Sequence, residues 1–225
     1  MKTHANADSL ARSHRMPSMP NHRTMLICCP VCRMRREECV CSQAPRLCIS
    51  TRLIVVIHSK EWRRSTNTGH LARLAVKDAE VRLHGLPHQA VRSAGIDAAS
   101  ASTLVLFPGR GARPLTTQLI APLPRPLTLL VPDGNWNQAK KMMSRVPMLM
   151  QATPVSLAGS NLDAHCLRTN VRVGRMSTFE SIAQALGILE GEEIEGQLLE
   201  FFQKILDRMV HSSRRGNRNR ELTCQ

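Results

Sequence analysis

Four cysteines near the start of the chain have the spacing of metal ligands: Cys29 and Cys32 are separated by two residues, and Cys39 and Cys41 by one. Four thiolates in two close pairs can form a closed tetrahedral shell around Zn²⁺, which is the arrangement of a structural zinc site. The sequence therefore predicts a structural zinc ion bound by these four cysteines. Two alternatives remain open: a cluster of free thiols, and a site in which the adjoining Cys28 replaces one ligand.

A candidate reactive carboxylate lies in the stretch VPDGNWNQAKKM, residues 131–142, where an apolar run ends. Asn135 is a good helix N-cap, and Gln138 follows three residues later, as in a capping box. Because Asn135 can cap the helix, Asp133 has no capping role, so it is either a turn residue or a reactive group at the edge of a sheet. Trp136 either packs on that edge or stacks on a nucleic-acid base.

The loop HSKEWRRSTNTGHL, residues 58–71, brings opposite charges to the end of a predicted strand. Burying the charges of Glu61 and the neighbouring arginines at this place costs free energy unless the charges pair with one another or bind a ligand. Thr66, Asn67 and Thr68 are also candidate helix caps. The basic side chains that we expect to contact phosphate groups are Arg63, Arg64, Lys140 and Lys141.

Apolar runs that alternate with helical patterns must position these residues. Strands are predicted at residues 53–58, 102–109, 127–134 and 153–159, and helices at residues 67–85, 135–146, 178–191 and 192–210. Buried strands that alternate with helices imply an α/β fold with a mostly parallel sheet and flanking helices. Since ligands bind beyond the carboxyl ends of such strands, we expect the loops after the first three strands to lie at one edge of the sheet.

The charge of the chain indicates a polyanionic partner. There are 31 Lys and Arg residues against 17 Asp and Glu residues, a formal net charge of +14. Such an excess favours nucleic-acid binding. No apolar run approaches the roughly 20 residues of a membrane-spanning helix, and the N-terminal stretch lacks the apolar segment of a signal peptide. We therefore expect a cytoplasmic protein with no membrane partner.

Composition divides the chain into four parts. We expect a disordered basic arm at residues 1–24, a small zinc ribbon at residues 25–48, an α/β domain at residues 49–210 and a basic tail at residues 211–225. Clustered thiols in a reducing compartment favour metal binding over disulfides. Nothing in the sequence indicates an obligate protein partner.

Taken together, the motifs of the chain resemble those of the DTW-domain family, whose signature is Asp-x-Thr-Trp. The residues similar to this signature are Asp133, Gly134, Asn135 and Trp136. A cysteine ribbon, TNTG and LFPG precede them, and LRT (167–169) and STFE (177–180) follow, in the family's order. The resemblance covers residues 29–185. Asn135 stands where the family has Thr, and both residue types can cap a helix.

The resemblance implies that residues 49–210 form a DTW-type catalytic domain of SPOUT-like fold, a superfamily that includes knotted enzymes. DTW-domain proteins are tRNA-uridine aminocarboxypropyltransferases. They transfer the 3-amino-3-carboxypropyl group of S-adenosylmethionine to N3 of a uridine in tRNA, which gives acp3U and 5′-methylthioadenosine. Asp133 is then the candidate general base for the N3 proton. The implied partner is tRNA, and the SPOUT-like relationship is compatible with a homo-oligomer.

The family motifs also imply a binding site for S-adenosylmethionine as co-substrate. Arg168 is suited to a bidentate contact with its carboxylate, and Glu61 or Glu180 to a contact with its ammonium group. The residues implied to bind the co-substrate are Glu61, Thr66, Asn67, Thr68, Gly69, Phe107, Pro108, Gly109, Arg168, Ser177, Thr178 and Glu180.

Two other functions remain open at this point. A SPOUT-type RNA methyltransferase would use the same cofactor but transfer its methyl group, so that the mass of the modified nucleoside distinguishes the two reactions. A non-catalytic zinc-ribbon RNA-binding protein would bind RNA without binding S-adenosylmethionine.

Overall fold

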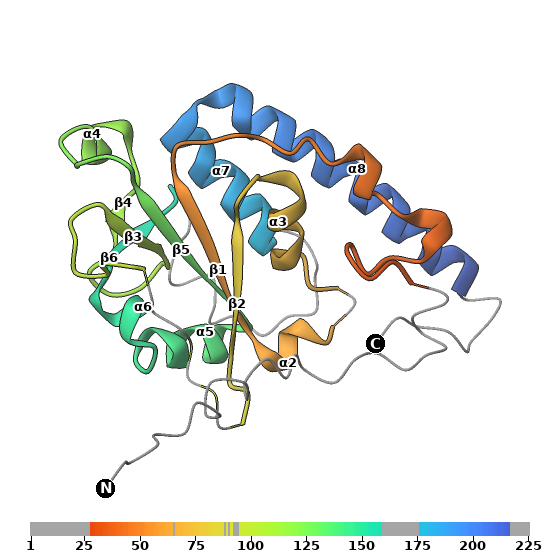
Figure 1. Cartoon of the computed structure of the whole chain (residues 1–225), viewed down its shortest axis with the longest axis horizontal. Helices are drawn as coiled ribbons and strands as arrows, with labels where there is room; N and C mark the ends of the chain where they lie inside the picture. The colour runs from red at the N-terminus through yellow and green to blue at the C-terminus, as the bar shows by residue number, and fades with distance from the viewer. Residues whose placement is uncertain are drawn as a thin grey trace, which may run out of the picture.

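A computed structural model describes residues 28–64, 66–87, 89, 91, 95–158 and 176–216, with side chains up to residue 209. In these residues, six strands form one sheet in the order β2-β1-β5-β3-β6-β4, and every neighbouring pair is parallel (Figure 1). The strands are β1 (Arg52–His58), β2 (Glu80–His84), β3 (Thr103–Leu106), β4 (Arg113–Pro114), β5 (Thr128–Asp133) and β6 (Thr153–Ser156). The predicted α/β fold with a parallel sheet is confirmed.

Helices connect and flank these strands. The α-helices are α2 (Ser59–Trp62), α3 (Ala72–Ala75), α4 (Thr117–Ile120), α5 (Trp136–Met143), α6 (Pro147–Gln151), α7 (Thr178–Glu190) and α8 (Glu192–Gly216). The 3₁₀ turns are η1 (Arg36–Glu38), η2 (Cys41–Gln43) and η3 (Gly69–Leu71). The predicted helices around residues 135–146, 178–191 and 192–210 are confirmed as α5, α7 and α8.

The central strand β5 lies between β1 and β3, and its register fixes where the motifs meet. Ile57 of β1 is paired with Asp133 of β5, and Leu104 of β3 with Leu129 of β5. Since the three strands run parallel, the loops after β1, β3 and β5 lie at the same edge of the sheet. This edge is the carboxyl edge, where we expected them.

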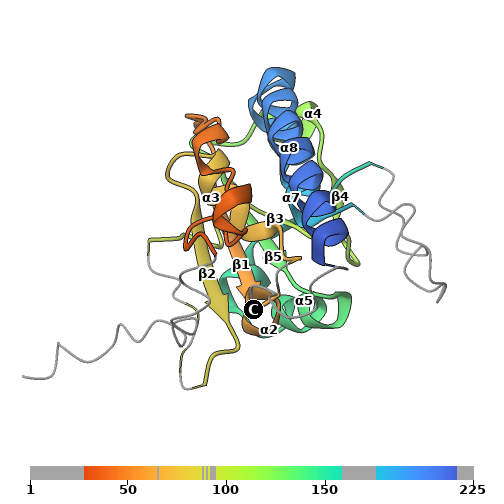
Figure 2. The ribbon, with the colours of Figure 1, turned by 90° about the vertical axis from the view of Figure 1, so that its right-hand side faces the viewer.

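Alternate side chains of the central strands pack into two separate cores, because side chains alternate between the faces of a strand. Val55 and Leu129 belong to the core under α3, α7 and α8. Val56 and Leu130 belong to the core on the other face, under α5 and α6. Figures 1 and 2 show the two helical layers on either side of the sheet.

The helix predicted at residues 67–85 is wrong over most of its length. Only η3 and α3 are helical there; the chain turns at Asp78, which has a φ of 61°, and then forms the edge strand β2. Val76, in an extended conformation, ends the helix before this turn. Val81 and Leu83, which alternate along β2, pack their apolar side chains against the core under α7 and α8. Pairing with β1 thus outweighs the helical pattern that we read in this stretch.

The cysteine ribbon is joined to the sheet domain by its own core residues. Val40 is fully buried and Leu47 almost so, and both belong to the core under α7 and α8. Leu47 also forms a parallel bridge with Val76, just after α3. The ribbon therefore packs directly on the sheet domain, and the division of the chain into four parts stays a prediction.

One predicted segment lies outside the described residues, and one helix continues past its predicted end. The basic arm at residues 1–24 lies outside the described residues, whereas α8 continues six residues into the predicted tail, to Gly216. In the part of the chain that the structure describes, no helix combines the length and the apolarity that a membrane crossing requires. The SPOUT-like relationship and its knot stay predictions.

Candidate active site and metal centre

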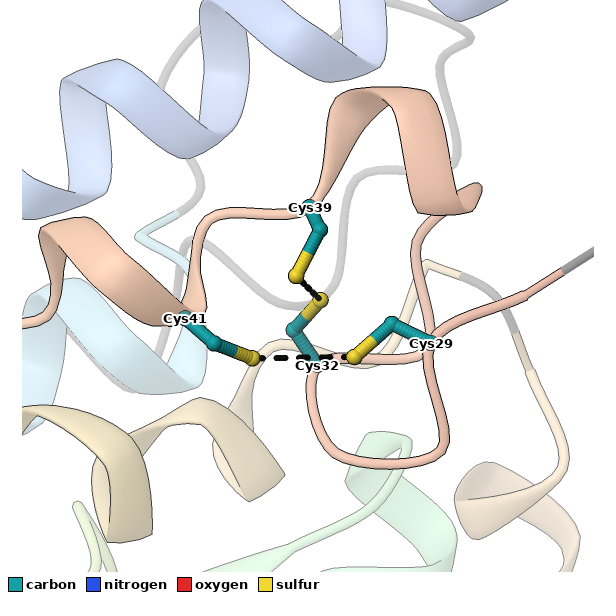
Figure 3. Close-up of side chains that lie close together, drawn as sticks. All are labelled: Cys29, Cys32, Cys39 and Cys41. Atoms are coloured by element: carbon teal, nitrogen blue, oxygen red, sulfur yellow. Dashed lines mark hydrogen bonds between the residues drawn. The ribbon is translucent and has the colours of Figure 1, made fainter.

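The side chains of the four ribbon cysteines converge on one point (Figure 3). All four sulfur atoms lie within 4.8 Å of one another, with 3.7 Å between Cys29 and Cys41 and 3.7 Å between Cys32 and Cys39. Tetrahedral zinc, with Zn–S bonds of about 2.3 Å, requires sulfur–sulfur distances of about 3.8 Å. The four thiols are free, two of the sulfur pairs are already at this distance, and small shifts of the side chains bring the group to the geometry of a zinc site.

The backbone of the ribbon points hydrogen-bond donors at these sulfurs. Burial raises the pKa of the Cys29 thiol, but hydrogen bonds from the backbone of Cys32 and Val31 and from the thiols of Cys39 and Cys41 together outweigh it and lower the pKa to about 7. Burial and the neighbouring thiols raise the pKa of Cys32 and of Cys41. Four thiolates at this distance repel one another unless a cation compensates their charge. The donor set therefore suits a bound divalent metal.

We expect one zinc ion per chain in protein purified without a chelator, measured by elemental analysis. Cys28 is not part of the four-sulfur group, and its backbone forms an antiparallel bridge with Arg35. Cys28→Ser should therefore keep the zinc, whereas Cys32→Ser should release it. Absence of stoichiometric metal from the native protein, or its loss in Cys28→Ser, would contradict this choice of ligands.

Asp133, at the carboxyl end of β5, is the most constrained polar residue of the sheet edge. Its side chain is buried, with 5% of the residue exposed. Asn67 Nδ2 donates to Oδ2 at 2.5 Å, and Thr178 Oγ1 donates to Oδ1 at 2.6 Å. The distance from Thr178 is typical of a hydroxyl that donates to an ionised carboxylate. Asp133 thus joins β5, the loop after α2 and the start of α7.

The loop after α2 approaches this carboxylate so closely that only glycine fits at position 69. A Cβ added to Gly69 would overlap Oδ2 of Asp133 and lie 2.9 Å from its Cγ. The φ of Gly69 lies outside the left-handed region, so the requirement for glycine comes from space and not from backbone conformation. The TNTG motif therefore supplies both a hydrogen-bond donor and room for the carboxylate.

Burial raises the pKa of Asp133 above its ordinary value. The hydrogen bonds from Thr178 and Asn67 lower it, and the nearby charge of Glu61 raises it, so that the net shift is upward. A carboxylate with a raised pKa is a stronger base than a solvated one. Its position at the end of a central strand is where ligands bind in parallel sheets.

Glu61 of α2 has one oxygen that is still free to bind a ligand. Its Oε2 lies 3.2 Å from Arg64 Nη1, so the charges of this loop do pair, as one of our two alternatives required. Its Oε1 is buried and has no hydrogen-bond partner among the described residues. An unpaired buried carboxylate oxygen is costly, and it is suited to a ligand that donates, such as an ammonium group.

The DTW domain family matches residues 26–210 of the chain. The chain belongs to the DTW-domain family. One relative is "tRNA-uridine aminocarboxypropyltransferase 2" of Drosophila melanogaster, which is 28% identical over 179 residues, 76% of this chain and 68% of that protein. Another is "tRNA-uridine aminocarboxypropyltransferase A" of Arabidopsis thaliana, 26% identical over 216 residues, 83% of this chain and 81% of that protein.

A third relative, "tRNA-uridine aminocarboxypropyltransferase 2" of Macaca fascicularis, is 27% identical over 83% of this chain. The DTW-domain chain spans only 63% of the length of that protein. No solved structure matches the chain. The resemblance predicted from the motifs is thus confirmed at the level of the family.

The DTW motif forms the start of α5. Asn135 Oδ1 accepts from Gln138 N at 3.0 Å, and Gln138 Oε1 accepts from Asn135 N at 2.7 Å, which completes the predicted capping box. Trp136 stacks on Phe107 of the LFPG motif, with ring centroids 5.0 Å apart and planes inclined by 16°. Trp136 therefore packs on the sheet edge, whereas its stacking on a nucleic-acid base stays a prediction.

Because Asn135 caps α5 through its side chain, the family's Thr should serve equally well at this position. We expect Asn135→Thr to hold or raise activity and to shift the melting temperature little. Asn135→Ala, which removes the cap, should destabilise the protein by about 0.5–2 kcal/mol. A large loss of activity in Asn135→Thr would mean that the Asn amide itself has a role beyond the cap.

The remaining residues that we predicted to bind the co-substrate differ in how close they lie to Asp133. Thr178 contacts it directly, whereas Ser177 caps α7 in a second capping box, in which Glu180 Oε2 accepts from Ser177 N at 2.7 Å. Pro108 and Gly109 follow β3 at the same edge. Arg168 and the LRT motif lie outside the described residues.

The predicted phosphate-binding residues lie on two adjacent elements. Arg63 and Arg64 follow α2, Lys140 and Lys141 lie on α5, and all four are exposed. Since α2 follows β1 and α5 follows β5, and these strands are neighbours, both elements lie at the same edge of the sheet (Figures 1 and 2).

Sequence reasoning missed His70. This residue is 3% exposed and lies between Asn67 and the ribbon, with Nε2 3.2 Å from the carbonyl oxygen of Cys32. Burial, together with the charges of Arg33 and Arg73, lowers its pKa to about 4, although the hydrogen bonds to Cys32 and Asn67 raise it. A single histidine after TNTG has no spacing that would have distinguished it from an ordinary core residue.

Proposed function

We propose that the protein transfers the 3-amino-3-carboxypropyl group of S-adenosylmethionine to N3 of a uridine in tRNA, with 5′-methylthioadenosine as the second product. Membership of the DTW family and the names of the relatives support this activity. The observation that carries the proposal is Asp133, a buried carboxylate with a raised pKa, held at the carboxyl edge of the sheet by two donors.

In the proposed reaction, Asp133 accepts the N3 proton of uridine, because N3 is a poor nucleophile until that proton leaves. The bond from N3 to the γ-carbon of the aminocarboxypropyl chain forms as the carbon–sulfur bond breaks, and the thioether leaves as 5′-methylthioadenosine. The sulfonium of the co-substrate already makes this carbon electrophilic. The protein must then select the γ-carbon over the methyl group by orientation.

The residues around Asp133 fit the polar groups of S-adenosylmethionine. The unpaired Oε1 of Glu61 is suited to its ammonium group. One oxygen of Glu180 is committed to the capping box, which makes Glu61 the better of the two candidates. Arg168 is proposed to bind the carboxylate. The rest of the co-substrate site is proposed along Thr66, Thr68 and the LFPG loop.

Mass spectrometry of nucleosides from tRNA incubated with the protein and S-adenosylmethionine tests the proposed reaction. We expect a uridine that carries an aminocarboxypropyl group and an equal amount of 5′-methylthioadenosine. A methylated uridine with S-adenosylhomocysteine would instead identify an RNA methyltransferase. Binding of tRNA without any modification and without binding of S-adenosylmethionine would favour a non-catalytic RNA-binding protein.

We expect tRNA binding to be salt-sensitive and to use the basic edge formed by Arg63, Arg64, Lys140 and Lys141. Replacing both lysines by Ala should weaken tRNA affinity and reduce the slope of log K against log salt concentration by roughly 0.7–0.9 for each phosphate that is no longer neutralised. Lys204→Ala on α8, where the lysine pairs with Glu200, is the matched control. Equal slopes for the double variant and the control would contradict this placement.

A further inference from the structure

A continuous series of hydrogen bonds runs from the metal ribbon to Asp133. His70 Nε2 lies 3.2 Å from the carbonyl oxygen of Cys32, one of the four cluster cysteines. The backbone N–H of His70 donates to Asn67 Oδ1 at 3.3 Å, and Asn67 Nδ2 donates to Asp133 Oδ2 at 2.5 Å. Thr178 of α7 completes the series on the other carboxylate oxygen.

The donor and the acceptor of each bond in this series can be assigned in turn. A carbonyl oxygen only accepts, so the bond to Cys32 places the ring proton of His70 on Nε2. The backbone N–H of His70 then holds the amide oxygen of Asn67, which turns its amide NH₂ toward Asp133. In this tautomer the neutral ring has no proton on Nδ1, so its 3.2 Å contact with Asn67 Oδ1 is not a hydrogen bond, and the backbone N–H alone holds the amide. Each of the remaining bonds fixes the orientation of the next group in the series.

The packing around His70 ties the same residues to the turn between Cys29 and Cys32. The ring of Trp62 lies edge-on to His70, with centroids 6.1 Å apart, and the guanidinium of Arg33 lies 4.8 Å from the centre of the Trp62 ring. Arg73 Nη2 donates to the carbonyl oxygen of Val31 at 3.3 Å. A change in the conformation of this turn is therefore transmitted to buried side chains that have little room to move.

We propose that His70 and Asn67 are positioning residues that couple metal binding in the ribbon to the orientation of Asp133. In this arrangement the zinc ion orders the Cys29–Cys32 turn, the Cys32 carbonyl holds His70, and Asn67 holds the carboxylate toward the carboxyl edge of the sheet. The coupling itself rests only on the hydrogen bonds and packing; its effect on turnover rests on the proposed function of Asp133. Coupling between two sites is reciprocal, so breaking the series changes metal affinity as well.

The two tryptophans of the chain provide a test that needs no turnover. In a Trp62→Phe background, Trp136 of the DTW motif is the only tryptophan, and it lies three residues after Asp133. Zinc is added to the chelator-stripped full chain while Trp136 emission is recorded, and zinc binding is measured separately against a chromophoric chelator. We expect zinc to shift the emission, and Asn67→Ala to abolish the shift while one zinc ion still binds.

The outcomes of this titration separate coupling from simple metal-dependent folding. An emission that does not respond to zinc in the background protein would overturn the proposal. A response of the same size in Asn67→Ala would also overturn it, because the signal would then reach Trp136 by another route. Circular dichroism before and after zinc removal establishes that the fold is retained during the measurement.

Steady-state kinetics with saturating zinc tests the positioning role. We expect His70→Leu to lower kcat by about 10- to 100-fold, with the KM for S-adenosylmethionine nearly unchanged, and to weaken zinc affinity by a similar factor, as outer-shell changes do at metal sites. His70→Gln keeps a donor for the Cys32 carbonyl and should restore most of both. Arg73→Ala, which removes one hydrogen bond to the turn but leaves the series itself intact, should weaken zinc affinity and, once zinc saturates the ribbon, lower kcat less than His70→Leu does.

A merely structural His70 would behave differently. It would lower thermal stability in His70→Leu without changing kcat per folded molecule, and that result would overturn the positioning role. If no variant and no native protein modifies tRNA, the proposed function fails, but the response of Trp136 to zinc still decides whether the ribbon and Asp133 are coupled.

Discussion

Asp133→Asn is expected to lower turnover on tRNA by about 100- to 10,000-fold while the protein keeps its fold and its affinity for S-adenosylmethionine. An amide cannot accept the N3 proton, but it can keep both hydrogen bonds of the carboxylate. Its oxygen can accept from Asn67, and its NH₂ can donate to the hydroxyl of Thr178, which both donates and accepts. The substitution therefore removes the base and leaves the architecture.

The stability of Asp133→Asn provides the control for this experiment. Because burial raises the pKa of Asp133 in the folded protein above its ordinary 3.8, the folded state binds the proton more tightly than the unfolded chain. The stability contributed by the protonated form is present below that ordinary value and is lost as the pH rises through the raised pKa. At neutral pH the wild type therefore bears the cost of a buried charge, which Asn does not.

We thus expect Asp133→Asn to melt at the same or a higher temperature than the wild type at pH 7, with the difference shrinking as the pH is lowered toward 4. Activity of the wild type should fall on the acid side at a pH above the ordinary pKa of aspartate, since the base must be ionised. Near-normal turnover in Asp133→Asn would show that the carboxylate is structural, and Glu61 would be the next candidate base.

The elements that depend on local patterns could be predicted from the sequence. Short apolar runs predicted β1 and β5, and the capping box at Asn135 predicted the start of α5, because the residues that form each signal are close together in the sequence. The helix prediction at residues 67–85 was wrong because the structure there depends on residues that are distant in the sequence. The strand in this stretch is stabilised by pairing with β1, and that pairing is not visible in the local pattern.

In the candidate site, too, features that depend on nearby residues could be predicted, whereas contacts between distant residues could not. The spacing of the cysteines predicted a four-sulfur cluster, since all four ligands lie within thirteen residues of chain from Cys29 to Cys41. The partners of Asp133 are far away in the sequence: Asn67 is 66 residues before it and Thr178 is 45 residues after it. Both were expected to contact the co-substrate. Only the topology of the sheet and the placement of α7 bring them to the carboxylate.

Gly69→Ala is expected to affect the protein as strongly as the loss of Asp133. The new Cβ would overlap Oδ2 of Asp133, so that the carboxylate must leave the position in which Asn67 and Thr178 hold it. We expect a loss of stability of about 1–3 kcal/mol, as for other overpacked cores, and a loss of turnover comparable to that of Asp133→Asn. Thermal unfolding and the nucleoside assay measure the two effects.

A double-mutant cycle with Asp133→Ala separates this clash from any other effect of alanine at position 69. In that background the oxygen and the carboxyl carbon are gone, and the nearest atom to the new Cβ is the Cβ of residue 133 at 3.4 Å, an ordinary van der Waals distance. Gly69 does not have a left-handed φ, so alanine should then be neutral or stabilise the protein by about 0.4–1 kcal/mol through the unfolded state. The sign of the substitution therefore depends on Asp133. Equal destabilisation of both backgrounds by Gly69→Ala would contradict this explanation. It would mean that the requirement for glycine in the TNTG loop does not come from the space that the Asp133 carboxylate occupies.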